Sequence, residues 1–257
     1  MSSNFKPIIS ALNLKRAISA ISSLVDEATF KFTKEGMSCK VLDPARVGMG
    51  HVQYPPISFK RYVCDTDTEI TINLTELDKC LKNVGKDEDI ELGLELNKLL
   101  LNIVGTRYKN IMKIKTLEPT SDDLASKDTP RLRYEAEVKM TIDGFSRGVE
   151  DVRIVSDAIT FFVDKSKFEM SGEGVLGTQN PSFVKGQTES LLSLKVDENV
   201  NVRTTYPLVY LDDILAGTKG VSDIIILEFG NNMPLHISFG LISGVLEYWM
   251  APRIQNE

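Results

Sequence analysis

Hydrophobic residues recur at helical spacing in four segments of the chain, at residues 13–25, 75–84, 144–155 and 210–217. The first segment shows the pattern most fully, with an apolar stripe of Leu14, Ala17, Ile18, Ile21, Leu24 and Val25. Its opposite face carries Lys15, Arg16 and serines, and no acidic residue precedes Asp26. A stripe of this kind is typical of a helix that buries one face and exposes the other.

Most of the remaining chain consists of segments in which apolar and polar residues alternate. Many of these segments are rich in Val, Ile and Phe, and the pattern predicts β-strands. In the first half these segments are residues 28–33, 37–43, 47–54, 61–65, 69–74, 89–96, 99–105 and 108–117. In the second half they are residues 133–140, 158–164, 167–171, 190–196, 223–230, 234–240 and 244–251. The chain is therefore expected to belong to the α+β class.

The second half repeats the first. Leu74, Leu77, Asp78 and Leu81 match Leu208, Leu211, Asp212 and Leu215 at a constant offset of 134 residues. An offset near half the chain length predicts two similar domains rather than an array of short repeats. Between them, residues 117–132 are rich in Pro, Ser, Thr and Asp, which indicates an exposed connection. We expect domains at 1–117 and 133–257, joined by a loop at 118–132.

Composition limits the class of protein. The 257 residues are 42% hydrophobic and carry a net charge of −6, which argues against a broadly basic nucleic-acid-binding surface. The sequence has no apolar run of 18 residues and no signal-peptide pattern at its start, so an intracellular protein without a membrane is expected. Cys39, Cys64 and Cys80 form no C-x-x-C pair and are expected to be reduced thiols.

The sequence shows no motif typical of a catalytic, metal or cofactor site. The two histidines, His51 and His236, lie in unrelated contexts, and no zinc-ligand spacing occurs. Residues 172–177, GEGVLG, fit a dinucleotide-binding pattern, but Pro181 and polar residues follow where that site needs a helix, so a hairpin or loop is expected. We expect no enzyme, no catalytic residue, no metal and no cofactor.

Several stretches, in order along the chain, resemble the sliding clamps of the proliferating cell nuclear antigen family, in its archaeal and eukaryotic branch. They are VLDPARVGM, NLTELDKCLKNV, KFEMSGEG, NNMPLHISF and LEYWMAPRI. Each stretch is short, but their order, the chain length and the two-domain repeat make the resemblance specific.

The resemblance implies a DNA-clamp fold, in which each domain places antiparallel sheets outside and two helices inside. Three chains would close head to tail into a ring around double-stranded DNA. Such a clamp gives DNA polymerase its processivity in DNA replication and repair. Through short peptide motifs it tethers the polymerase, flap nuclease and DNA ligase, and a clamp loader opens it. A DNA-associated location would follow, in the nucleus of a eukaryote or the cytoplasm of an archaeon.

The resemblance also implies which residues face DNA. Basic side chains on the helices or at their ends would line the hole: Lys15, Arg16, Lys79, Lys82, Arg147 and Lys219. Glu150 departs from the pattern, because the family usually has a basic residue there. Asp212 and Asp213 make the fourth helix acidic, so attraction for phosphate is expected to be uneven around the hole.

A pocket for partner peptides is the second site that the resemblance implies. It would take a peptide that carries a Gln and a hydrophobic–aromatic plug. The residues carried over are Leu42, Arg46, Val47, Met49, Leu124, Pro234, Trp249, Met250, Ala251 and Pro252. The alternative for Trp249 and Met250 is that they only end a buried strand.

Two further readings of the function remain open. One is a checkpoint-type clamp subunit that forms a heterotrimer with paralogues. The other is a protein–protein adaptor that does not encircle DNA. A ring needs edges that pair with another chain, and the segments at 108–114 and around residues 175–184 are the candidate edge strands.

Overall fold

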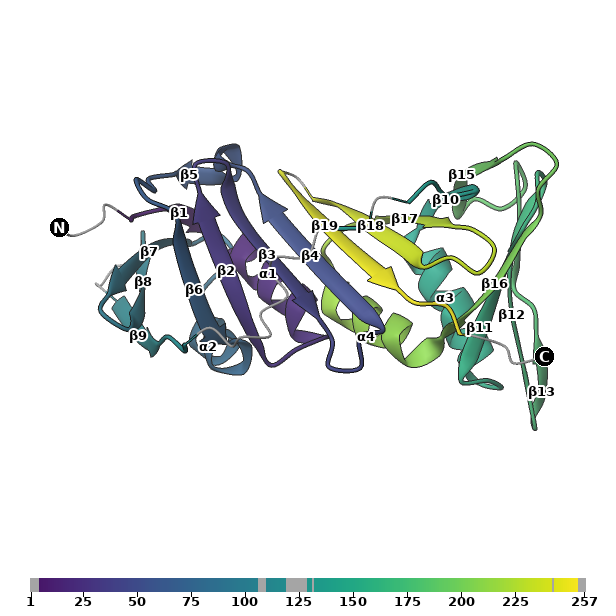
Figure 1. The fold of residues 1–257 in the computed structure, drawn as a ribbon, viewed down its shortest axis with the longest axis horizontal. Helices are drawn as coiled ribbons and strands as arrows, with labels where there is room; N and C mark the ends of the chain where they lie inside the picture. The colour runs from purple at the N-terminus through teal and green to yellow at the C-terminus, as the bar shows by residue number, and fades with distance from the viewer. Residues whose placement is uncertain (1–4, 106–109, 119–128, 131, 242, 254–257) are drawn as a thin grey trace. The chain divides into compact units, whose positions relative to one another are not determined.

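The computed structural model describes residues 5–105, 110–118, 129–130, 132–241 and 243–253. The chain divides into two compact units (Figure 1). Unit 1 comprises Met1–Pro44, Met49–Asp128 and Leu241–Leu246, and unit 2 comprises Ala45–Gly48, Thr129–Gly240 and Glu247–Glu257. The described residues form mainly antiparallel sheets with four α-helices, which confirms the expected α+β class.

Unit 1 contains two of the helices and two runs of strands. In chain order its elements are β1 (Ile8–Ser10), α1 (Ala11–Ser22), β2 (Glu27–Thr33), β3 (Gly36–Leu42), β4 (Gly48–Tyr54), η1 (Pro56–Ser58), β5 (Phe59–Arg61), β6 (Thr68–Asn73), α2 (Leu74–Leu81), β7 (Asp89–Glu95), β8 (Lys98–Val104) and β9 (Asn110–Lys115). One sheet has the order β5-β1-β7-β8-β9, and the other run is β4-β3-β2-β6. Strand β9 stands at the end of its sheet order.

Unit 2 repeats this arrangement. Its elements are β10 (Ala136–Thr141), α3 (Ile142–Arg153), β11 (Ala158–Val163), β12 (Lys167–Gly174), β13 (Gly177–Gln179), β14 (Ser182–Val184), β15 (Leu191–Val196), β16 (Val202–Pro207), α4 (Leu208–Thr218), β17 (Ile224–Phe229), β18 (Leu235–Leu241) and β19 (Gly244–Met250). One run of strands is β15-β10-β17-β18-β19, and the other sheet is β13-β12-β11-β16, with β14 also paired to β12. Strand β13 stands at the end of its sheet order.

Side-chain caps fix where the helices begin. Ser10 accepts a hydrogen bond from the Asn13 backbone N–H at 3.2 Å, and Thr141 accepts one from the Gly144 N–H at the same distance. Asn73 caps α2 in the same way at 3.0 Å. These caps satisfy N–H groups that have no partner inside the helix. Helix α1 therefore starts at Ala11, two residues before the predicted start.

The repeat seen in the sequence is a repeat of buried positions. Leu74, Leu77 and Leu81 of α2 are buried, as are their counterparts Leu208 and Leu211 of α4. Each of these helices directly follows a strand, β6 in unit 1 and β16 in unit 2. In both units, equivalent leucines thus anchor a short helix to the core.

The core of unit 2 centres on Phe161 of β11, which is fully buried. Its ring centroid lies 5.3 Å from that of Phe168 on β12, 5.7 Å from Phe229 on β17 and 6.0 Å from Phe145 on α3. These partners come from both runs of strands and from a helix. The cluster therefore joins three layers of the unit. Burial of each such side chain contributes roughly 1.5–3 kcal/mol to stability.

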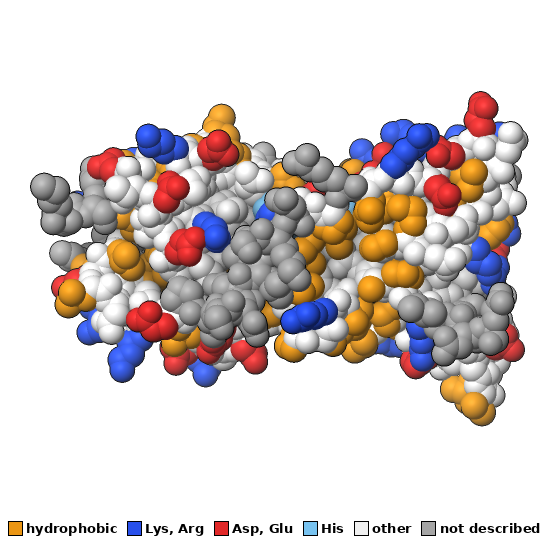
Figure 2. Space-filling view, viewed as in Figure 1, with side chains coloured by type: hydrophobic (Ala, Val, Ile, Leu, Met, Phe, Trp, Pro, Cys, Tyr) orange, Lys and Arg blue, Asp and Glu red, His pale blue; other side chains and the backbone are white. Residues whose placement is uncertain are grey.

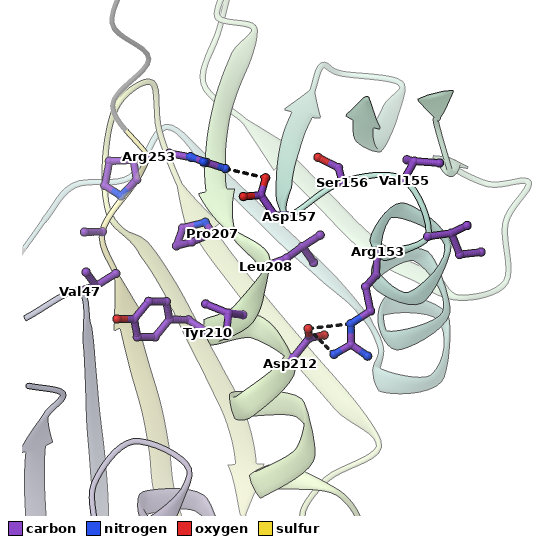
Figure 3. Close-up of a pocket in the computed structure, with 14 residues that line it drawn as sticks. Val47, Arg153, Val155, Ser156, Asp157, Pro207, Leu208, Tyr210, Asp212 and Arg253 are labelled. Carbon is purple, nitrogen blue, oxygen red and sulfur yellow. Dashed lines mark hydrogen bonds and ion pairs between the residues drawn. The ribbon is translucent and has the colours of Figure 1, made fainter. Parts of the chain in front are cut away.

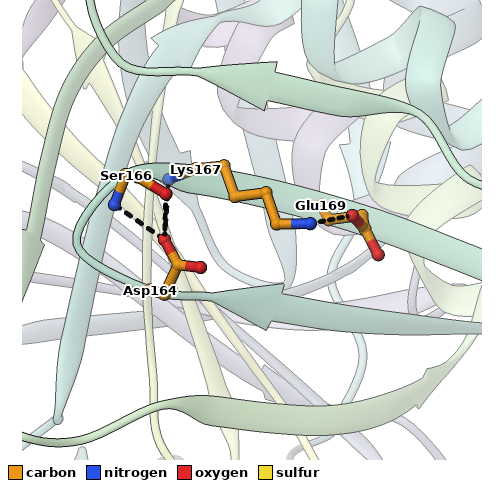
Figure 4. A network of polar contacts seen from close by, with 4 residues as sticks. All are labelled: Asp164, Ser166, Lys167 and Glu169. Carbon is orange, nitrogen blue, oxygen red and sulfur yellow. Dashed lines mark hydrogen bonds and ion pairs between the residues drawn. The ribbon is translucent and has the colours of Figure 1, made fainter.

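Turns in unit 2 follow from local chemistry. After β11, one carboxylate oxygen of Asp164 accepts hydrogen bonds from the Ser166 N–H at 2.7 Å and the Lys167 N–H at 3.0 Å (Figure 4). A short polar side chain that binds the backbone two residues on is a common way to close a turn. The GEGVLG stretch joins β12 to β13 as a hairpin, which confirms that it is not a dinucleotide-binding loop.

Some sequence-based boundaries are wrong. The strand predicted at 61–65 lies instead at Phe59–Arg61, and Cys64 makes only an isolated bridge with Phe5. The three-residue strand β1 and the strand β16 were not predicted. The described part of the chain contains no helix that is both long and apolar enough to cross a membrane.

Candidate functional site

The predicted DNA-facing residues of unit 1 lie on α1 and α2, which pack against each other. Lys79 and Lys82 are exposed at the end of α2, where Lys82 is the C-terminal cap. No carboxylate of the described residues lies within ion-pair distance of either lysine. Both ammonium groups are therefore available to an anion in solution.

Lys15 and Arg16 are half-buried rather than fully exposed. The Lys15 ammonium donates a hydrogen bond of 2.6 Å to the backbone carbonyl of Val84, just beyond α2. A lysine near a helix C-terminus satisfies a carbonyl that the helix leaves open. Lys15 thus also ties α1 to the end of α2, a structural task that the sequence did not reveal.

In unit 2, Arg147 of α3 and Lys219 at the C-terminal cap of α4 are exposed, as predicted for residues that face solvent or DNA. The exposed residues around them are mostly acidic. A shallow depression of about 660 Å³ between the two helices is lined by six charged side chains, namely Asp143, Glu150, Arg153, Asp212, Lys219 and Asp223. Two are basic and four are acidic.

Arg153 is tied to Asp212 across the two helices. The Arg153 Nε donates to the Asp212 Oδ2 at 2.8 Å, and a terminal guanidinium nitrogen contacts the same oxygen (Figure 3). Burial and the neighbouring charge of Asp212 raise the pKa of Asp213, the next residue of α4. Carboxylates are thus crowded on this part of α4.

A pocket of about 820 Å³ lies in unit 2 at the start of α4 (Figure 3). Three of the predicted peptide-binding residues, Val47, Ala251 and Pro252, line it. The Ala251 N–H donates to the Val47 carbonyl at 2.9 Å, which holds these two walls together. Pockets with mainly apolar walls and a few polar groups are the usual form of a ligand-binding site.

Two of the apolar residues that line this pocket are exposed. Ile154 is 62% exposed and Val209 is 59% exposed, and both line the pocket. In the space-filling view, hydrophobic side chains gather on the same face of unit 2, where Figure 1 draws β19 and the segment after it (Figure 2). Exposed apolar side chains that cluster mark an interaction surface more often than isolated ones do.

Two Arg–Asp pairs flank the pocket. Besides Arg153 and Asp212, Arg253 donates to the Asp157 carboxylate at 2.9 Å, and this partner lowers the pKa of Asp157. The Arg253 backbone N–H also donates to the Thr205 carbonyl at 2.7 Å, which fixes the segment after β19 against β16. The charged side chains that line the pocket are thus paired with one another, and most of the other lining residues are apolar.

Trp249 and Met250 do not line this pocket, because both are buried in β19. The Trp249 ring stacks on His236, with centroids 4.7 Å apart and planes 17° apart. Glu228 and Glu247 lie 2.7 Å and 3.3 Å from the two ring nitrogens of His236. Burial alone would lower the pKa of His236, but the neighbouring carboxylates of Glu247 and Glu228 outweigh it, so the pKa is raised.

The other predicted pocket residues lie elsewhere in the described structure. Leu42 and Met49 are half-buried and face each other in register on β3 and β4 of unit 1. Arg46 is exposed and adopts a positive φ of 60°. Pro234 is half-buried at the start of β18. Leu124 lies outside the described residues, so its role stays a prediction.

Sequence reasoning missed one wall of the pocket, formed by Asp157, Pro207, Leu208, Val209 and Tyr210. Only Tyr210 fell in a predicted helix, Leu208 was used only as a position of the repeat, and no residue of this wall was assigned a role in binding. An exposed Val at the start of an amphipathic helix is the one local signal that could have indicated them. Among the described residues, no group of three or more His, Cys, Asp or Glu side chains is placed to hold a metal ion.

Comparison with known proteins gives consistent results along the chain. Residues 7–121 match the family model described as proliferating cell nuclear antigen, N-terminal domain, and residues 128–254 match that of its C-terminal domain. The chain is 30% identical over 245 residues to the DNA polymerase sliding clamp of Cenarchaeum symbiosum, covering 95% of this chain and 96% of that protein. It is 33% identical over 243 residues to DNA polymerase sliding clamp 1 of Thermococcus kodakarensis, covering 93% and 94%.

The fold has a close counterpart among solved structures. The crystal structure of PCNA from Thermococcus kodakaraensis superposes with a TM-score of 0.88 at 23% identity, covering 97% of this chain and 100% of that chain. At this identity the likeness concerns the fold. Together with the two domain matches, it leads to one conclusion: this chain belongs to the proliferating cell nuclear antigen family.

Proposed function

We propose that this protein is a DNA sliding clamp, a non-catalytic processivity factor that encircles duplex DNA and tethers DNA polymerase and other enzymes of replication and repair. The observation that carries the proposal is the match of both family domains, with identity of 30–33% to proteins named DNA polymerase sliding clamp over nearly the whole chain. The protein would be DNA-associated in the cell. The domain boundaries at 117/118 and 132/133 belong to this proposal.

The ring would form by pairing of β9 of one chain with β13 of the next. Each strand ends the order of its sheet, and strand edges carry N–H and C=O groups that a second chain can satisfy. Ile111 on β9 is 40% exposed and Leu176 beside β13 is 79% exposed, so both edges also offer apolar surface. Head-to-tail contacts that close after three copies give a trimer in which neither the β9 edge nor the β13 edge is left unpaired.

Light scattering over a range of concentrations tests the ring. The 28.6 kDa chain should show three times its mass. Ile111→Arg, which places a charge on the β9 edge, should lower that mass toward the monomer, whereas Ile57→Arg at an exposed site outside any strand should not. A monomer at all concentrations would exclude the homotrimer. The same monomer that assembles only with paralogues would favour the checkpoint-type alternative.

DNA would be held by the basic side chains of the helices, with Lys79 and Lys82 the most exposed in unit 1. In unit 2 the exposed basic residues are Arg147 on α3 and Lys219 at the end of α4, and in unit 1 Lys15 and Arg16 are half-buried on α1. Such contacts are independent of sequence and weakened by salt, which suits a protein that slides. Retention would come from encirclement rather than from affinity.

Partner proteins would dock a short peptide at the pocket lined by Val47, Tyr210, Ala251 and Pro252. The predicted motif has a Gln followed by a hydrophobic residue and two aromatics. Leu42, Arg46, Met49, Leu124 and Pro234 stay in the proposed site. Trp249 and Met250, which are buried at the end of β19, would not contact the peptide but would position Ala251 and Pro252, which follow them. DNA polymerase, flap nuclease, DNA ligase and the clamp loader are the proposed owners of such peptides.

Fluorescence of Trp249, the single tryptophan, tests this pocket from β19, because Ala251 and Pro252 follow that strand and line the pocket. A saturable change on addition of the peptide is expected, and Tyr210→Ala or Leu124→Ala should weaken binding by about thirtyfold if that residue is an anchor. Ile57→Ala, at an exposed apolar site of unit 1, is the matched control and should bind as the parent does. Unchanged affinity in both pocket variants would place the partner site elsewhere.

A further inference from the structure

The two helix pairs differ in charge although they are counterparts in the repeat. Helices α1 and α2 with the capping Lys82 carry four basic and two acidic side chains, a net charge of +2. Helices α3 and α4 with the capping Lys219 carry three basic and five acidic side chains, a net charge of −2. The second pair is therefore the poorer surface for a polyanion.

The ion pair of Arg153 removes one of the three basic groups from the second pair. Two guanidinium nitrogens converge on the Asp212 Oδ2, and the Asp212 side chain is only 22% exposed while that of Arg153 is 56% exposed. Charge-assisted hydrogen bonds of this kind are among the stronger polar contacts in proteins. A phosphate that approaches the exposed side of Arg153 meets a cation already neutralised by a carboxylate.

The surroundings of this pair strengthen the effect. Arg153 and Asp212 both line the depression between α3 and α4, where Asp143, Glu150 and Asp223 add negative charge and only Lys219 adds positive charge. In unit 1, by contrast, Lys79 and Lys82 have no ion-pair partner among the described residues. The difference lies in how the cations are partnered as well as in their number.

We propose that Asp212 withholds Arg153 from DNA phosphates, so that the α1–α2 face carries most of the phosphate contacts of this clamp and the α3–α4 face carries few. This inference rests on the proposed function, because it takes the helix faces as the surface that meets DNA. Asp212 is a determinant that weakens binding on one half of each chain. A clamp with fewer fixed contacts exchanges its phosphate partners more readily as it moves.

The direct test is Asp212→Asn, which keeps the size of the side chain and removes its charge. Released Arg153 should add about one phosphate contact, which makes the slope of log affinity against log salt steeper by about 0.9. Fluorescence anisotropy of a labelled linear duplex, titrated at several salt concentrations, measures both affinity and slope. Asp212→Ala serves as a second variant, and thermal melting of each protein checks that it is folded.

Two controls separate release of Arg153 from a general loss of negative charge. Glu150→Gln removes the same charge from the same depression, but Glu150 makes no ion pair among the described residues. Its effect on the salt slope should be smaller. Arg153→Ala in the Asp212→Asn background should abolish the gain, because no cation is left to release.

The outcomes distinguish this inference from the proposed function. A gain in Asp212→Asn that exceeds the gain in Glu150→Gln and disappears without Arg153 supports the inference. Equal gains in the two single variants, or no gain, overturn it. If Lys79→Ala with Lys82→Ala weakens DNA binding in that same series, the proposed function stands. If this double variant also leaves binding unchanged, the helix faces do not meet DNA and the proposed DNA contacts fail as well.

Discussion

Units 1 and 2 bury equivalent residues but expose different ones. Leu77 of α2 and Leu211 of α4 occupy matched buried positions, whereas Lys79 and Asp213 occupy matched exposed positions of opposite charge at the same offset of 134 residues. Packing tolerates few side chains at a buried site, while solvent tolerates many at an exposed one. The comparison shows that the repeat specifies the fold, and that the binding properties of each unit depend on its surface.

The largest effect is expected where the two units are alike. Leu77→Ala and Leu211→Ala each leave a cavity at a fully buried position, and each should lower the free energy of unfolding by about 2–5 kcal/mol. Urea denaturation followed by circular dichroism measures the loss. Lys82→Ala, at an exposed position, is the control and should change it by less than about 0.5 kcal/mol. A large loss in one leucine variant and none in the other would break the equivalence of the units.

The next effect is expected where the units differ. Replacing Lys79 and Lys82 together by Ala should remove about two phosphate contacts, flatten the salt slope of DNA binding by about 1.8 and weaken binding most at low salt. Replacing Arg147 and Lys219, the two exposed basic residues predicted to face DNA in unit 2, by Ala should flatten it less, because acidic side chains surround them. Anisotropy titrations measure both slopes. Equal slopes for the two double variants would contradict the charge difference.

A smaller effect on stability is expected from the helix caps, which the two units share only in part: α2 has a side-chain cap and its counterpart α4 has none. Asn73→Ala removes the side-chain cap of α2 and should cost about 1 kcal/mol of stability, whereas Asn73→Gly should cost only a few tenths. The counterpart position before α4 is Pro207, which makes no side-chain cap hydrogen bond. Pro207→Ala should therefore not show a cap loss. Thermal denaturation of the three variants measures the difference.

The smallest effect is a dependence on pH that belongs to unit 2. His236 is faced by Glu228 and Glu247 and stacked between Tyr134 and Trp249. Since its folded pKa is raised above the unfolded value of about 6.5, the added stability is fully present below pH 6.5 and is lost as pH rises through the folded pKa. Denaturation between pH 5 and 9 should show this loss, and His236→Gln should flatten it. An unchanged pH profile in His236→Gln would refute the role of this histidine.

The sequence predicted much of the fold because its signals were periodic. The apolar stripe of 13–25 gave α1, and alternation gave most strands, but Ile8–Ser10 is too short to show a period. Helix α1 ends at Ser22 rather than Val25, because Ser23 caps it with a backbone N–H to the Ile21 carbonyl and a hydroxyl to the Ala20 carbonyl, and the apolar stripe does not reveal such a cap. Strand β16 mixes Thr, Arg and Pro and resembles a loop in isolation.

The candidate site could be predicted only in part. Val47, Ala251 and Pro252 were found through the family resemblance, and the pocket does bring them together. Asp157 and Tyr210, by contrast, reach the pocket through pairing of β11 with β16 and the start of α4, which no local pattern reveals. The Arg153–Asp212 pair joins residues 59 apart in the chain and was likewise invisible. Long-range placement limits what one sequence can show.

The central claim is that the chain holds DNA by encircling it, and retention on DNA of defined topology tests this most directly. The protein is loaded onto a closed circular duplex with a clamp loader and ATP, and the complex is separated from free protein by gel filtration. Half of the sample is then linearised by a restriction enzyme and both halves are separated again. The account predicts that the protein stays on the circle and leaves the linear duplex. Equal retention on both forms would contradict it and would favour an adaptor that binds DNA, if at all, by surface contact alone.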